Sequence, residues 1–102
     1  MVIWIPQARA DLKAIHDYIA KDSSINAKQV VQEMRVKADA LVDFPRMGKV
    51  VPEVEHDDLR EIGVHSWRVI YHLRRQQVYV IAVVHKRRVL NQNDISRLSQ
   101  DN

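Results

Sequence analysis

The sequence predicts an α+β domain, with an N-terminal strand, an antiparallel pair of helices, and a three-strand antiparallel sheet on which the helices pack. Three observations support this prediction. Over residues 8–41, apolar residues recur every three or four positions, the spacing of one face of an α-helix. After Gly48 this spacing gives way to alternation, which is typical of β-strands. The strands then follow one another through short turns, so we expect them to pair antiparallel, with the helices covering one face.

Length and composition indicate one ordinary globular domain over residues 1–102. Apolar residues make up 46% and charged residues 28% of the chain, which argues against disorder. The absence of cysteine excludes a disulfide scaffold and a thiolate metal site. No apolar run approaches the roughly 18 residues of a membrane span, and the start has no export signal. We therefore expect a cytoplasmic protein.

The helical spacing falls into two segments separated by Lys21–Ser24, which offers capping residues. The apolar positions are Ala8, Leu12, Ile15 and Ile19 in the first segment and Ala27, Val31, Met34, Ala38 and Leu41 in the second. Pro45 and Gly48 end the second helix. Before the first helix, the apolar run Val2–Ile5 is closed by Pro6, which suits a short strand.

Three further strands are predicted, over residues 59–64, 67–73 and 78–84. The middle one alternates, so Tyr71 and Arg68 should lie on opposite faces of the sheet. The last one is apolar on both faces, which suggests a central strand. We expect the sheet face away from the helices to be free for a ligand or partner. Residues 91–102 form either a short helix from Gln92 to Ser99, with Asn91 as its cap and Ile95 and Leu98 as its apolar contacts, or a frayed tail.

Positive charge is concentrated in the second half of the chain. The net charge is +3 overall, yet residues 60–90 carry seven Lys or Arg against a single acidic residue, Glu61. Such asymmetry favours a polyanionic or acidic partner at one end of the molecule. The alternative is a solvated basic face with no partner.

The common catalytic and metal-binding motifs are absent. None of the five histidines has a metal-ligand spacing, and no cysteine assists them, so we expect no metal and no cofactor. The two glycines, Gly48 and Gly63, do not form a phosphate-binding loop. Ser66 lacks the flanking glycines of a nucleophile elbow.

Two kinds of residue remain as candidates. His85 precedes the run Lys86-Arg87-Arg88, where a neutral imidazole could accept a proton from a ribose hydroxyl while arginines stabilise the developing charge. Its alternative role is a structural hydrogen bond at the strand end. Arg60 and Arg68 lie within strands, where guanidinium groups bind either phosphates or internal carboxylates. The candidate internal partners are Glu53, Glu55 and Glu61.

These residues, taken together, resemble the ParE/RelE toxin superfamily, and its ParE-like branch most closely. The resemblance spans residues 4–88 in order. It is carried by Trp4, Ala8-x-x-Asp11-Leu12-x-x-Ile15-x-x-Tyr18-Ile19, Leu41-x-x-Phe44-Pro45-x-x-Gly48, Leu59-Arg60-Glu61, Trp67-Arg68-Val69-Ile70-Tyr71 and Val84-His85-Lys86-Arg87-Arg88.

The resemblance implies the toxin of a type II toxin–antitoxin (plasmid stabilisation) system, which causes growth arrest and is neutralised by a cognate antitoxin in a hetero-oligomer. ParE-like members inhibit DNA gyrase and are not enzymes, and the target-binding residues would then be Arg60, Arg68, Lys86, Arg87 and Arg88. RelE-like members are metal-independent endoribonucleases that cut messenger RNA on the ribosome, and the catalytic residues would then be His85, Arg68 and Glu53. RelE-like nucleases carry an aromatic residue near the C-terminus, but here no aromatic residue follows Tyr79. The hypothesis of gyrase inhibition is therefore favoured over that of a nuclease. A third alternative is an antitoxin-binding module that has lost toxicity.

Overall fold

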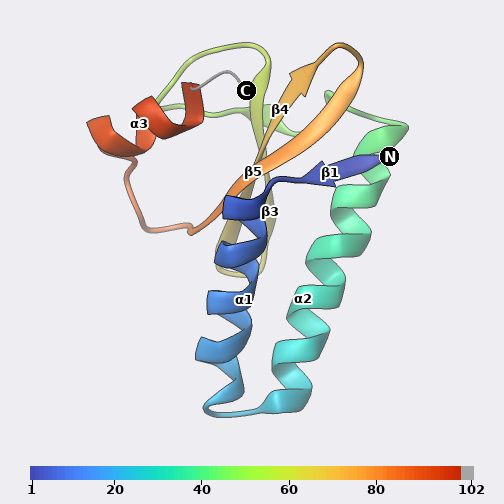
Figure 1. Cartoon of the computed structure of the whole chain (residues 1–102), viewed down its shortest axis with the longest axis vertical. Coiled ribbons are helices and arrows are strands. Elements are labelled where there is room, and N and C mark those ends of the chain that lie inside the picture. The colour runs from blue at the N-terminus through green and yellow to red at the C-terminus, as the bar shows by residue number, and fades with distance from the viewer. Residues whose placement is uncertain (100–102) are drawn as a thin grey trace.

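The computed structural model describes residues 1–99 of the chain. Along the sequence its elements are β1 (Val2–Trp4), α1 (Pro6–Ala20), α2 (Ser24–Asp39), a 3-10 turn η1 (Ala40–Val42), β2 (Lys49–Val50), β3 (Leu59–Val64), β4 (Trp67–Arg74), β5 (Gln77–His85) and α3 (Gln92–Ser99). Figure 1 shows α1 and α2 as an antiparallel hairpin, with α3 set apart from it. The predicted α+β class, the helix pair and the antiparallel meander β3–β4–β5 are confirmed.

The sheet has five strands in the order β1-β5-β4-β3-β2. β1 pairs in parallel with β5, and all other neighbours are antiparallel. Two details differ from the prediction. β4, not β5, is the middle strand, and a further strand β2 pairs with β3 through Lys49 and Val50. A two-residue strand next to Pro52 is too short to produce an alternating pattern, so periodicity could not reveal it.

The main core lies between the helix pair and the sheet. Its buried side chains come from both helices and from β3, β4 and β5: Ala8, Leu12, Ile15, Val30, Met34, Ala38, Leu41, Val64, Val69, Tyr71, Val78, Val80 and Val83. Both helices have clear start signals. Pro6 occupies the first turn of α1, and the Ser23 hydroxyl accepts a hydrogen bond from the backbone N–H of Asn26 (3.1 Å) at the start of α2.

The opposite face of the sheet is also covered, which corrects the expectation that it would be free. A second buried cluster there consists of Val51, Leu59, Ile70, Ala82, Val84 and Leu90. Val51 and Leu90 are 0% and 6% exposed and come from irregular segments on either side of the meander. Single apolar residues in loops have no periodicity, so no pattern could indicate that they would cover this face.

The C-terminal helix α3 begins as predicted, with Asn91 as its cap. The Asn91 Oδ1 atom accepts from the Asp94 backbone N–H (2.9 Å), and the Asp94 Oδ2 atom accepts from the Asn91 backbone N–H (3.0 Å). This reciprocal arrangement is a capping box. The contacts expected of Ile95 and Leu98, and residues 100–102 of the predicted tail, lie outside what the structure describes.

Within residues 1–99, no helix combines the length and the apolar character that crossing a bilayer requires.

The turn between β4 and β5 is strained, which gives a first prediction. Arg75 and Gln76 form this two-residue turn with φ angles of 49° and 65°, a left-handed conformation that favours Asn and Gly. The double substitution Arg75→Asn and Gln76→Gly is therefore expected to raise the free energy of unfolding by about 1 kcal/mol. Thermal unfolding would detect it as an increase of about 4–8 °C in Tm. The control Gln76→Ala keeps a Cβ atom in the strained region, so a similar gain from it would contradict the explanation.

Candidate functional site

The positive charges of residues 60–90 do not form one surface. Arg60 and Arg68 lie within strands, whereas Arg74 and Arg75 lie at the β4–β5 turn. The Lys86–Arg88 loop, which we call the basic loop, follows β5 at the other end of this hairpin. The two ends of the hairpin are separated by about 25 Å, given the nine residues of β5 and the rise per residue of a strand. The sequence therefore located the charge correctly but not its division into separate groups.

Arg68 is buried in an ion-pair cluster with Glu53 and Glu61. Its guanidinium donates two hydrogen bonds to the Glu53 carboxylate (2.9 and 2.8 Å) and two to Oε1 of Glu61 (3.1 and 2.6 Å). A further hydrogen bond reaches the backbone carbonyl of Arg88 (3.1 Å). Arg68 is only 7% exposed. Each of its three nitrogens is thus engaged inside the protein, and two of the three predicted internal carboxylates are its partners.

Glu53 connects this cluster to the basic loop. Its Oε2 atom also accepts a hydrogen bond from the backbone N–H of Leu90 (3.1 Å). The hydrogen bonds from Arg68 lower the pKa of Glu53 to about 2, from a usual value of 4.5. Such a carboxylate is a weak proton acceptor at neutral pH. Glu53 and Arg68 together hold the C-terminal end of the loop, at Arg88 and at Leu90 just beyond it.

Arg60 also serves an internal connection. Its Nε atom donates to the Asp57 carbonyl (2.9 Å) and its Nη1 atom to the Gly48 carbonyl (2.8 Å). Its Nη2 atom pairs with the Asp57 carboxylate (3.0 Å). Arg60 thereby joins the segments on either side of β2. Glu55, the third candidate carboxylate, is exposed and has a positive φ of 55°.

His85 lies on the other face of the sheet from Arg68. Its ring makes an edge contact with Trp67, with ring centroids 5.2 Å apart, and Trp67 packs against the helix-side core. The Nδ1 atom of His85 accepts a hydrogen bond from the backbone N–H of Arg87 (3.0 Å). Arg68 precedes Val69 on β4 and points the opposite way, because successive strand residues alternate in direction. The structure thus unites Glu53 with Arg68 but does not bring His85 to them.

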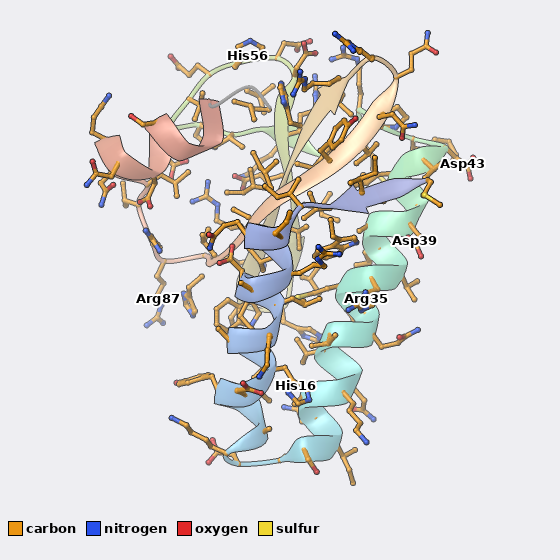
Figure 2. The ribbon with its side chains drawn as sticks, viewed as in Figure 1. His16, Arg35, Asp39, Asp43, His56 and Arg87 are labelled. Atoms are coloured by element: carbon orange, nitrogen blue, oxygen red, sulfur yellow. The ribbon has the colours of Figure 1, made fainter. Side chains whose placement is uncertain are left out.

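The basic loop itself is exposed. Its three residues, Lys86, Arg87 and Arg88, are exposed, and the Arg88 guanidinium pairs with the Asp94 carboxylate. Figure 2 shows the Arg87 side chain projecting outward from the link between β5 and α3. A hollow of about 470 Å³ lies between this loop and the Arg68 cluster. Within residues 1–99, no group of three or more His, Cys, Asp or Glu is arranged to hold a metal ion.

Two residues of this region were not candidates from the sequence. Lys49, on β2, lines the hollow and approaches Glu61 to 3.9 Å, and no sequence signal marked it because its position depends on the pairing of β2. Asp94 holds Arg88 and closes the capping box, and the spacing Asn91-x-x-Asp94 is a signal that could have identified it.

Comparison with known proteins identifies the family of the chain. The model of a family described as the ParE toxin of the type II toxin–antitoxin system, parDE, matches residues 2–90. The chain belongs to the ParE toxin family. The ParE match includes every residue of the Arg68 cluster and the basic loop, and it ends before α3 begins.

The chain is also similar to individual proteins named for either branch of the ParE/RelE superfamily. The chain is 32% identical over 89 residues to a protein named Toxin RelE2 from Caulobacter vibrioides, which covers 86% of this chain and 97% of the relative. A solved structure described as a chromosomal ParDE TA system from P. aeruginosa matches with a TM-score of 0.68 at 20% identity. That match covers 82% of this chain and 92% of the other, and at this identity it supports the fold alone.

Proposed function

We propose that this ParE-family chain is a cytoplasmic toxin that is neutralised by a cognate antitoxin and acts by binding DNA gyrase. The observation that supports binding rather than catalysis is the basic loop. Lys86, Arg87 and Arg88 are exposed, and the hydrogen bonds to Glu53 and Arg68 hold the backbone on which they stand. An exposed group of cations on a fixed backbone suits electrostatic contact with an acidic protein surface or nucleic acid.

The nuclease alternative is disfavoured by the same geometry. A metal-independent endoribonuclease needs its general base and its cation around one phosphodiester. Glu53 has a pKa of about 2, so it cannot serve as an effective base near neutral pH. His85 lies on the opposite face of the sheet from Arg68, so these groups do not surround a common point.

Charge reversal of the basic loop tests the proposal. The variant Lys86→Glu/Arg87→Glu is expected to need at least about tenfold more protein than wild type for half-inhibition of gyrase supercoiling, because it replaces attraction by repulsion. The measurement is a supercoiling and DNA-cleavage titration with purified toxin. The matched control is Lys28→Glu, an exposed residue on α2, which should inhibit like wild type.

Three outcomes would contradict the gyrase proposal. The first is that wild-type protein at micromolar excess leaves both supercoiling and cleavage unchanged. The second is that induction in cells arrests growth together with specific cuts in messenger RNA mapped by primer extension, which would favour the nuclease. The third is induction without growth arrest, which would leave only the antitoxin-binding module.

For the antitoxin we propose an acidic, amphipathic segment that becomes ordered on binding. Charge complementarity with the net charge of +3 supports this, and so does the family in which toxin and antitoxin are paired. Its association should weaken with added salt, because exposed charges are screened.

A further inference from the structure

The outer edge of β3 is only partly covered by β2. The Val51 N–H bonds to the Leu59 carbonyl (3.0 Å) on the β2 side, and the Leu73 N–H bonds to the Asp58 carbonyl (2.9 Å) on the β4 side. Backbone groups alternate in direction along a strand, so the odd-numbered residues of β3 face outward. β2 pairs only with residues 60 and 61. Within residues 1–99, the N–H and C=O groups of Gly63 therefore point to an edge that no strand covers.

Two hollows flank this edge on opposite faces of the sheet. The first, of about 450 Å³, lies on the helix side and includes the apolar residues Ala40, Met47 and Ile62. The second, of about 470 Å³, lies on the other side. Its lining contains four cations (Lys49, Arg68, Lys86 and Arg88) and two carboxylates (Glu53 and Glu61). Gly63 lines both hollows, so they adjoin at the open edge.

We propose that this edge binds an extended acidic peptide segment of a partner protein as an additional strand. The segment would exchange backbone hydrogen bonds with Gly63. Its successive side chains would point to opposite faces, since strand residues alternate. An apolar side chain enters the first hollow, and the next side chain, a carboxylate, enters the second beside Lys49 and Lys86. The inference rests on the proposed binding of an acidic antitoxin segment, and it specifies where and in which conformation that segment binds.

A peptide fits this edge better than a nucleic acid does. Gly63 offers both a donor and an acceptor, and a peptide backbone supplies the complement of both, whereas a phosphate can only accept. Lys37 and Lys49 also line the first hollow, but Ala40, Met47 and Ile62 offer an aliphatic side chain an apolar contact that a phosphate would not make.

The absence of a side chain at Gly63 keeps the edge accessible. A Cβ atom there would lie 3.1 and 3.2 Å from Cε and Nζ of Lys86, the flexible end of a long side chain. A substitution at this position is thus accommodated by a small movement of Lys86 and should leave the fold intact. A carboxylate placed at residue 63 would occupy the second hollow itself.

The test uses the full chain and a ten-residue peptide that alternates valine with glutamate. The peptide is titrated into the protein, and hydrogen exchange of the backbone amides is measured by NMR. At saturation, the bound peptide is expected to slow exchange of the Gly63 N–H at least about tenfold. Gly63→Asp and Lys49→Glu/Lys86→Glu should each weaken the peptide at least about tenfold, while Gly63→Ala and Lys28→Glu stay within about threefold of wild type. A peptide N-methylated along one edge should lose binding, because it cannot donate to the Gly63 carbonyl.

Several results would overturn this inference. One is that a peptide alternating valine with lysine binds as tightly as the valine–glutamate peptide, and another is that the bound peptide protects other amides from exchange but not that of Gly63. The remaining two are dimerisation of the free chain through this edge, and binding of a single-stranded RNA of equal length at the same residues more tightly than the peptide. None of these measurements involves gyrase or growth arrest. Failure here with intact gyrase inhibition would therefore reject the edge site alone.

Discussion

Replacing Arg68 with alanine is expected to lower the free energy of unfolding by about 3–5 kcal/mol, because removing one member of a buried ion-pair cluster leaves the other charges uncompensated. Glu53 and Glu61 would then face each other with side chains that are 18% and 8% exposed. The carbonyl of Arg88 would also lose a donor. In a domain of this size the loss is a large fraction of the total stability. Urea unfolding monitored by circular dichroism measures it.

Two comparison variants separate charge from geometry. Arg68→Lys keeps the positive charge but cannot form the forked pair with Glu53, so an intermediate loss is expected. Replacing Arg68, Glu53 and Glu61 together by methionine and two leucines should recover much of the stability, since no buried charge remains. If Arg68→Ala unfolds at the same urea concentration as wild type, the cluster does not stabilise the protein and the explanation fails.

The same cluster sets a dependence on acid. The pKa of Glu53 is about 2 in the folded protein and near 4.5 when unperturbed, so folding favours its charged form. The resulting stability is complete above about pH 4.5 and decreases as the pH falls toward 2. Urea midpoints should therefore fall on acidification more steeply for wild type than for Glu53→Gln, which has no proton to gain.

The elements predicted best are those whose secondary structure follows from the pattern of their own residues. The apolar spacing of both helices and the alternation of β4 reflect local contacts with one core, so they could be read directly. What failed depends on pairing between distant segments. The strand β2 and the covering of the second sheet face by Val51 and Leu90 follow from tertiary contacts that leave no periodic pattern.

The candidate site divides in the same way. Charge counting located the basic loop, and the chemistry of guanidinium groups correctly offered Glu53 and Glu61 as partners of Arg68. Neither argument could predict that Arg68 is buried or that His85 lies on the opposite face of the sheet from Arg68. Both facts depend on the register of β4 with β5, in which Trp67 is opposite His85. Register is set by the whole sheet, so it was inaccessible from these residues alone.

A second large effect is expected at Gly48, where Gly48→Ala should cost about 3 kcal/mol or more, on the scale of overpacking in a rigid core. A Cβ atom at this position would lie 2.5 Å from the Glu61 carbonyl oxygen and 2.6 Å from the Tyr71 hydroxyl. Neither of these two atoms can move away without a large cost in free energy. Glu61 belongs to β3, and the buried Tyr71 hydroxyl accepts from the Gly48 N–H (3.0 Å) and donates to the Pro45 carbonyl (2.7 Å).

The two glycines of the chain provide a matched pair for this prediction. Gly63→Ala meets only the mobile end of Lys86 and should change the unfolding free energy by less than about 1 kcal/mol, whereas Gly48→Ala meets backbone and a buried ring. Tyr71→Phe isolates the hydrogen bonds from the crowding and should cost about 1–3 kcal/mol, since it leaves a buried N–H and a carbonyl without partners. Equal unfolding midpoints for Gly48→Ala and Gly63→Ala would contradict this account. By these hydrogen bonds Tyr71 holds the turn after α2 against the sheet. This contact positions the start of β2, and therefore the open edge of β3 that lies beyond β2.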